Sequence, residues 1–174
     1  LKKKNIDFIV APYEADAQLS YLCRHKFCDF VITEDSDMIP YECPTTVFKL
    51  DNNGNCESID YNHIFKLVIF KHFTSRMLLE ACVLSGCDYL PSAPRIGIRT
   101  AIKMIGIHNT GEAAIEQAIK AGKVDFPEGY LENFREAVNV FRSQKVFDPS
   151  KKQTVPCFEN NNSKLSGEDL PNEY

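Results

Sequence analysis

Acidic residues gather in two short stretches near the start of the chain. Glu14 and Asp16 follow one apolar run, and Glu34, Asp35 and Asp37 follow a second. Carboxylates held close together repel one another strongly unless a cation lies between them. Ligands that are all oxygen suit Mg²⁺ or Mn²⁺ rather than zinc. The chemistry expected of such a site is in-line attack on a phosphodiester by metal-activated water, with two ions about 3.5–4 Å apart.

Each acidic stretch also has a purely structural interpretation. An acid in the first turn of a helix is often only a cap or a complement to the helix dipole, and this applies to Glu14. The sequence TEDSD at residues 33–37 is also compatible with a solvated loop. Two acidic stretches after consecutive buried strands favour the metal site. Spacing alone does not separate a nuclease from a phosphatase or a receiver-like domain.

The elements that must position these acids follow from the apolar pattern. Residues 6–10 form a β-branched and aromatic run, Pro12 opens a helical pattern that continues to Cys23, and residues 27–33 form a second strand-like run. Strand, helix and strand within about thirty residues predict a βαβ unit with two parallel, buried strands. Because open α/β folds bind ligands at the carboxyl ends of their strands, we expect the two acidic stretches to converge there.

The middle of the chain predicts a hairpin followed by a series of helices. Residues 46–50 and 57–59 flank the turn-rich sequence DNNGN, which favours a hairpin. Apolar periodicity predicts helices over residues 61–72, 76–85, 100–105, 111–121 and 128–144. Side chains that can cap three of these helices precede them, namely Asp60, Thr74 or Ser75, and Thr110. From Asp148 onward the periodicity is lost, and we expect a flexible tail.

The net charge of −4 over 174 residues is divided unevenly along the chain. Residues 13–60 hold ten acids and three bases, whereas residues 61–125 hold eight bases and five acids. Such a chain is not a simple basic coat for nucleic acid. Its 44% share of hydrophobic residues is typical of a globular protein, and its longest apolar runs are far shorter than a membrane span. We therefore expect no membrane association.

The cysteines and the first residues of the chain indicate which sites and signals to expect. The seven cysteines contain no C-x2-C pair and the four histidines no H-x3-H pair, so a zinc site is not expected. Buried free thiols in a reducing compartment are the better interpretation. No charged and then apolar leader opens the chain, which predicts no secretory signal. Because Leu1 lies just before a strand-like run, we interpret the sequence as a fragment of a longer protein.

Three motifs in a fixed order resemble the internal nuclease region of the XPG/flap endonuclease family. They are APYEADAQ at residues 11–18, ITEDSD at residues 32–37 and LSGCDYLP at residues 84–91. The resemblance extends over roughly residues 6–155. Tyr13, Asp16 and the sequence VFDP at residues 146–149 favour the exonuclease branch of the family over the flap endonucleases.

The resemblance implies a 5′-structure-specific nuclease with an α/β fold. The expected core is a partial PIN-like or resolvase-like parallel sheet, followed by an α-helical region with a helix–two-turn–helix. The family's metal-binding and catalytic acids match Glu14, Asp16, Asp35, Asp37 and Asp88. Two Mg²⁺ or Mn²⁺ ions are implied for the complete enzyme. Glu34 has no counterpart among these acids, and Asp88 alone is equally compatible with an acid that caps a helix end.

The sequence LPSAPRIGIRTAIK at residues 90–103 resembles the family's helix–two-turn–helix, which grips the unbroken DNA duplex. Backbone N–H groups at a tight turn and a helix start can bind a phosphate, although the same sequence is also compatible with a solvated basic helix. Expected DNA contacts are Arg95, Gly97, Arg99, Thr100 and Lys103. The resemblance also implies a potassium ion held by the backbone carbonyls of Ser92 and Ile96.

One position in this segment departs from the family pattern. The family usually has Gly-Ile-Gly where this chain has Arg95, Ile96 and Gly97. Loss of the first glycine matters most if the position needs a positive φ, because only glycine adopts such a backbone without cost. Arg95 could instead replace the lost phosphate contact with a charged one, and the sequence leaves both interpretations open.

The expected organisation is an internal nuclease core over residues 1–88, a helix–two-turn–helix region over residues 89–147 and a tail over residues 148–174. The family's amino-terminal region carries further metal-binding aspartates and a helical arch, and it is absent from this chain. We therefore expect the isolated 174 residues to be inactive.

The function expected from these features is that of part of a 5′→3′ DNA exonuclease and 5′-flap endonuclease in nuclear DNA repair or recombination. Its partners would be duplex DNA with a 5′ end, nick, gap or flap, together with repair proteins, and it would act as a monomer. Alternatives are a non-catalytic duplex-binding module and a PIN-like ribonuclease. The full set of five acids disfavours the first, and the helix–two-turn–helix disfavours the second.

Overall fold

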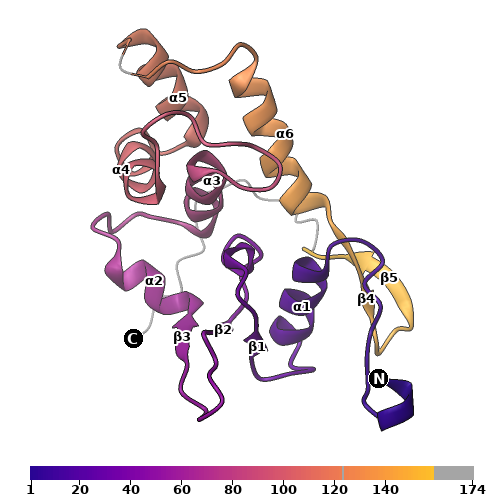
Figure 1. Ribbon diagram of the computed structural model, residues 1–174. Coiled ribbons are helices and arrows are strands. Elements are labelled where there is room, and N and C mark those ends of the chain that lie inside the picture. Colours follow the sequence, from indigo (N-terminus) through magenta and orange to yellow (C-terminus); the bar gives the residue numbers. More distant parts are fainter. Residues whose placement is uncertain (123, 159–174) are drawn as a thin grey trace.

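The computed structural model describes residues 1–122 and 124–158 (Figure 1). A three-stranded sheet of β1 (Val31–Ile32), β2 (Thr45–Phe48) and β3 (Glu57–Asp60) forms the first half together with the helix α1 (Ala15–Arg24). β1 runs parallel to β2, and β2 runs antiparallel to β3 with Thr46 opposite Ile59. The short 3₁₀ helices η1 (Lys2–Lys4) and η2 (Ser36–Met38) complete this half. The predicted α/β class and the hairpin are confirmed.

The second half is helical, as the apolar periodicity predicts. It consists of α2 (Tyr61–Leu67), α3 (Ser75–Ser85), α4 (Ile98–His108), α5 (Gly111–Lys120) and α6 (Tyr130–Ser143). The side chains of Asp60, Thr74 and Thr110 accept hydrogen bonds from the first-turn N–H groups of α2, α3 and α5, so these three caps are confirmed. None of the helices among the described residues has the length and apolarity needed to cross a membrane.

The main hydrophobic core lies around α3. This helix packs against α4, α5 and α6, which surround it in Figure 1. Its buried apolar residues repeat at helical spacing, and they include Leu78, Ala81 and Leu84. A smaller cluster forms where α1 meets η2, and it contains Cys23, Met38 and their neighbours. The acidic stretches therefore lie on elements that are anchored to two cores.

The first predicted strand is not formed. Residues 6–10 are extended but make no strand pairing with any described residue, and the Val10 side chain is 77% exposed. The parallel partner of β1 is β2 rather than residues 6–10, and only two residues of the predicted 27–33 strand are in the sheet. The prediction failed because an apolar run indicates a tendency to be buried, whereas a strand also needs a neighbouring backbone to pair with.

The predicted flexible tail is wrong over residues 148–158. β4 (Lys145–Asp148) pairs antiparallel with β5 (Gln153–Pro156), with Phe147 opposite Thr154. Cys157 is buried beyond the second strand. Helical periodicity does not reveal a strand pair this short, and its turn contains no glycine to signal it. Residues 159–174 lie outside the described part of the chain.

Candidate functional site

Glu14 and Asp16 lie at the beginning of α1. Glu14 is the N-cap residue with an extended backbone, but its side chain makes no hydrogen bond to the helix. The cap interpretation therefore does not describe Glu14, and its exposed carboxylate is available for another role. Asp16 lies in the first turn and is half-buried. Both acids benefit from the positive end of the helix dipole.

Asp35 and Asp37 follow the carboxyl end of β1. The Thr33 N–H continues the parallel ladder by donating to the carbonyl of Val47, and the Thr33 hydroxyl accepts from the Asp35 N–H at 3.0 Å. Asp35 Oδ1 then accepts from the Asp37 N–H at 2.8 Å and starts η2. These local hydrogen bonds set both carboxylates at the same edge of the sheet.

Glu34 is directed to a different partner from its two acidic neighbours. Its Oε1 accepts a hydrogen bond from the Lys49 N–H at 2.8 Å, at the end of β2. The hydrogen bond gives Glu34 a structural role in the hairpin.

Asp88 lies in a tight turn that follows α3. Gly86 ends the helix with a φ of 103°, and Cys87 and Leu90 then exchange both backbone hydrogen bonds, at 2.9 and 3.2 Å. Asp88 and Tyr89 are the two central residues of this turn, and Asp88 is exposed. The helix therefore ends at Gly86, two residues before Asp88. The interpretation of Asp88 as an acid that caps the helix end does not apply.

The structure brings all five predicted acids into one electrostatic cluster. Burial, followed by the charges of the other four acids with Asp35 first, raises the pKa of Asp37 to about 6. Burial also raises the pKa of Asp16, with smaller contributions from Asp35, Glu14 and Asp88. Carboxylates from three separate segments of the chain are therefore close enough to repel one another. In the absence of a cation, this repulsion is a cost to the folded state.

The donor set of the cluster fits a hydrated magnesium ion. Within the described residues, no three histidine, cysteine or acidic side chains are grouped closely enough to enclose an ion directly. Mg²⁺ does not require such a cage, because it keeps several waters and typically binds one or two carboxylates together with substrate phosphates. The cluster offers only carboxylate oxygens, partly desolvated and mutually repelling, which is the chemistry that such a cation neutralises.

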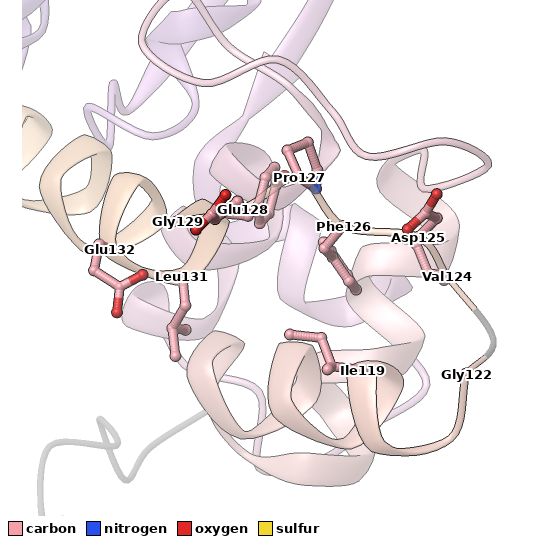
Figure 2. A pocket seen from close by; sticks show the side chains of 11 residues that line it. Ile119, Gly122, Val124, Asp125, Phe126, Pro127, Glu128, Gly129, Leu131 and Glu132 are labelled. Atoms are coloured by element: carbon pink, nitrogen blue, oxygen red, sulfur yellow. The ribbon is translucent and has the colours of Figure 1, made fainter.

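A hollow of about 680 Å³ lies in another part of the molecule, between the end of α5 and the beginning of α6 (Figure 2). Ile119, Phe126 and Leu131 line it together with acidic side chains such as Asp125. None of the five clustered acids borders it. Glu14, Asp35 and Asp88 are exposed, so the acidic cluster is open to solvent on at least these three side chains.

The segment between α3 and α4 contains a turn that bears on the missing glycine. The Ile96 N–H donates to the Ala93 carbonyl at 3.1 Å, and Pro94 and Arg95 are the central residues of this turn. Arg95 has a φ of 68°. A proline followed by a positive φ is the pattern of a type II turn, in which glycine is preferred at the third position. The position therefore does need a left-handed backbone, and Arg95 adopts it at some cost.

The other predicted DNA contacts lie at the beginning of α4. Gly97 is the N-cap residue and supplies no side-chain cap, so the first N–H groups of the helix have no such partner. Arg99, Thr100 and Lys103 are exposed on the helix. Neither the Ser92 nor the Ile96 carbonyl accepts a hydrogen bond from another described residue.

Comparison with known proteins agrees with this arrangement. Residues 5–88 match the family model of the XPG I-region. The first half of this chain is therefore similar to an XPG I-region. All five clustered acids lie within the matched residues, and the predicted resemblance to the XPG/flap endonuclease family is confirmed.

Curated relatives extend the similarity across most of the chain. Exonuclease 1 of Oryza sativa subsp. japonica is 43% identical over 160 residues, which are 89% of this chain and 19% of that protein. Exonuclease 1 of Arabidopsis thaliana is 39% identical over 157 residues, which are 89% of this chain and 21% of that protein. This chain thus spans about a fifth of the length of these relatives.

Solved structures share the fold. Flap endonuclease-1 from Methanococcus jannaschii matches with a TM-score of 0.60 at 21% identity, over 78% of this chain and 39% of that one. The Holliday junction-resolving enzyme GEN1, in complex with product DNA and Mg²⁺, also has a TM-score of 0.60 at 21% identity, over 81% and 40% of the two chains. A GEN-1 structure binding potassium matches with a TM-score of 0.54 at 22% identity, over 81% and 41%.

Sequence analysis did not predict the polar contacts that attach α1 to β4. Gln18 and Tyr21 on α1 form buried hydrogen bonds with Phe147 and Asp148 of β4. A buried glutamine in an otherwise apolar helical stripe was the available signal, because buried polar side chains need partners.

Proposed function

We propose that this chain is part of a divalent-metal-dependent 5′→3′ DNA exonuclease and 5′-flap endonuclease. One observation carries the proposal: five acids from three separate segments gather in one cluster within an XPG I-region. The identity to Exonuclease 1 relatives over 89% of the chain supports the exonuclease branch. We further propose a nuclear protein that acts in DNA repair or recombination, because the relatives that support it are named as exonucleases.

The catalytic residues of the proposal are the clustered acids, which would hold Mg²⁺ or Mn²⁺ in the complete enzyme. They are Glu14, Asp16, Asp35, Asp37 and Asp88. When bound, a pair of such ions activates water and stabilises the leaving oxygen of a phosphodiester. The chain itself would contribute the negative charge that recruits the ions. It would also fix two of the acids through the turn at residues 35–37.

Duplex DNA would contact the turn at residues 93–96 and the beginning of α4. Arg95, Arg99 and Lys103 would pair with phosphates, and the free N–H groups near Gly97 and Thr100 would donate hydrogen bonds to another phosphate oxygen. These contacts would be to the sugar-phosphate backbone of the DNA and not to its bases, as a structure-specific enzyme requires. The substrates would be duplexes with a 5′ end, nick, gap or flap, bound by a monomer that also meets repair proteins.

A potassium ion is proposed at the same turn. The carbonyls of Ser92 and Ile96 are not used by other described residues, and a structurally similar GEN-1 is described as binding potassium. In this proposal residues 1–88 supply the chemistry and residues 89–147 hold the duplex, so the isolated chain would bind DNA better than it cleaves it.

The experiment that tests the proposal compares substrates with the full-length gene product. Purified protein is incubated with 5′-flap and nicked DNA duplexes, and with matched RNA-containing flaps, in Mg²⁺ or in EDTA. We expect Mg²⁺-dependent release of 5′ products from DNA. Equal or faster cleavage of RNA would instead support the PIN-like ribonuclease, and duplex binding without any cleavage would support the non-catalytic module.

A further inference from the structure

The helix that carries Glu14 and Asp16 is held by a hairpin more than a hundred residues away in sequence. Gln18 is buried, and its carboxamide makes two hydrogen bonds to the backbone of Phe147. The amide nitrogen donates to the carbonyl at 2.9 Å, and the Phe147 N–H donates to the amide oxygen at 2.7 Å. The side chain of Gln18 thus pairs with β4 much as a neighbouring strand would. Figure 1 shows β4 running beside α1.

One turn further along α1, Tyr21 binds the next residue of the hairpin. Its hydroxyl donates to Asp148 Oδ2 at 3.0 Å, and both side chains are buried. Asp148 Oδ1 also accepts from the Ser150 N–H at 2.8 Å, the Ser150 hydroxyl at 2.6 Å and the Lys151 N–H at 3.1 Å. These hydrogen bonds hold the pKa of Asp148 well below its usual range, so its carboxylate stays charged. Asp148 therefore joins the hairpin turn to α1.

The last turn of α1 makes a third attachment. The Arg24 guanidinium donates to the Cys157 carbonyl at 2.8 Å and stacks over the Phe158 ring at 4.3 Å. The Cys157 thiol donates to the Ala17 carbonyl at 3.5 Å. Because Gln18, Tyr21 and Arg24 are spaced three apart, the three attachments follow one side of the helix.

The attachments matter because, among the described elements, α1 otherwise contacts mainly η2 and β1, which lead to the second pair of acids. Cys23 packs beside Met38 of η2, the element that begins at Asp35 and includes Asp37. The hairpin holds the helix from another direction. An isolated ten-residue helix is marginal in water, so its first turn is ordered by what the rest of the helix contacts.

We propose that the β4–β5 hairpin braces α1, and that Gln18, Tyr21 and Asp148 are positioning residues for the metal-binding acids. They touch no ion or substrate; they fix the distance from Asp16 to the acids at the end of β1. This inference rests on the proposed function for its catalytic consequence. The brace itself is a statement about the fold, which is measurable separately.

The test uses two variants and one control. Tyr21→Phe removes only the hydroxyl that joins α1 to Asp148, and Asp148→Asn removes the charge that holds the turn. Thr110→Ala is the control, because it removes the side-chain cap of α5, an element that carries none of the five acids. Urea unfolding checks that all three variants are folded and comparably stable.

The first measurement is amide hydrogen exchange of α1 in the metal-free chain. We expect roughly tenfold faster exchange of the α1 amides in Tyr21→Phe and Asp148→Asn, and no change there in Thr110→Ala. The double variant should be no worse than the more severe single variant, because both remove the same link. Unchanged α1 exchange in both single variants would overturn the brace.

The second measurement is the Mg²⁺ concentration for half-maximal flap cleavage by the full-length protein. We expect a roughly tenfold increase in both brace variants, recovery at saturating Mg²⁺, and no shift in the control. An equal loss of rate at every Mg²⁺ concentration would contradict a positioning role. If the unaltered protein cleaves nothing, the proposed function fails, and hydrogen exchange alone then supports or overturns the brace.

Discussion

At the scale of single residues, repulsion within the acidic cluster lowers the stability of the metal-free fold. The Asp37 carboxyl is half-buried among four other acids, and its pKa is raised from the ordinary 3.8 to about 6. A raised pKa means that the folded protein binds a proton more tightly than the unfolded protein. Between pH 4 and pH 6, stability therefore falls as pH rises, because the folded state must give up that proton.

Asp37→Asn should accordingly stabilise the metal-free chain near pH 7.5. We expect an increase in the free energy of unfolding on the order of 1 kcal/mol, after allowing for solvent screening of the exposed part of the carboxyl. The difference from the unaltered chain should shrink toward pH 4, where Asp37 is protonated in the folded state. Urea unfolding at several pH values measures it.

Glu34→Gln is the matched control for this prediction. Glu34 is an exposed acid in the same stretch, but its partner is the Lys49 N–H. We expect no stabilisation by this change at any pH. Addition of Mg²⁺ should raise the melting temperature of the unaltered chain more than that of Asp37→Asn. A destabilised Asp37→Asn at pH 7.5 would contradict the clustered repulsion.

At Arg95, the side chain is charged but the backbone has a conformation that favours glycine. Its φ of 68° is a conformation that glycine adopts freely and that costs other residues about 1–2 kcal/mol. Arg95→Gly should therefore stabilise the chain by about 0.5–1 kcal/mol, less than the full relief because glycine loses more entropy on folding. Arg95→Ala keeps the strained backbone and loses only the charge. Unfolding and duplex-binding curves of the two variants separate the backbone effect from the charge effect.

At the scale of elements, the end of α3 determines where Asp88 lies. Gly86 has a φ of 103°, and a Cβ at this position would lie 3.1 Å from both Cβ and N of Ser92. Gly86→Ala therefore adds a close contact to an unfavourable backbone, and we expect it to cost about 2–3 kcal/mol. The contact also joins the turn of Asp88 to the proposed DNA-binding segment.

Gly54→Ala separates the two contributions. Gly54 has a φ of 85° in the hairpin loop, and a Cβ there would meet nothing within 4 Å. This variant should cost only the backbone strain, about 1 kcal/mol. Equal losses of unfolding free energy in the two variants would mean that the contact with Ser92 is unimportant.

The elements that sequence analysis predicted correctly are those with local signals. The helices of the second half have 3.6-residue periodicity and cap residues within three positions, so their information is contained in a few neighbouring residues. Residues 6–10 have no strand partner in the described part of the chain, and β4 is held against α1 more than a hundred residues away, and a local pattern specifies neither fact. The hydrogen bonds between α1 and β4 could not be predicted from the sequence, because they join residues more than a hundred positions apart.

The candidate site was predictable to a different extent at each acid. Asp35 and Asp37 follow a buried strand, so their convergence with Glu14 and Asp16 could be argued from the residues. Asp88 is more than fifty residues from Asp35 and follows a helix, so only the family resemblance indicated its role. Its position depends on the tertiary packing of α3 and on a two-residue turn.

At the scale of the whole molecule, opposite charges are separated along the chain. Residues 13–60 carry the acidic excess and residues 61–125 the basic one. Arg99 and Lys103 are exposed on α4. Arg99→Gln and Lys103→Gln should each weaken duplex binding by a similar factor for all sequences, and each should reduce the slope of log K against log salt by about 1. Binding isotherms at several salt concentrations measure the slope.

Two controls accompany the prediction on the salt dependence of duplex binding. Lys66→Gln removes an exposed base from α2, outside the proposed duplex contact, and should leave the slope unchanged. None of these three changes should alter the Mg²⁺ requirement for cleavage. A slope that falls equally in all three variants would indicate a diffuse charge effect in place of specific phosphate contacts.

The proposed separation of a metal centre from a duplex-binding segment is tested most directly by Asp37→Ala in the full-length protein. The measurement pairs the rate of Mg²⁺-dependent cleavage of a 5′-flap duplex with the affinity for the same DNA in Ca²⁺. We predict that cleavage falls by about a hundredfold or more while duplex affinity stays within about twofold. Retained cleavage, or a loss of affinity as large as the loss of rate, would contradict the assignment of the acidic cluster as the metal centre.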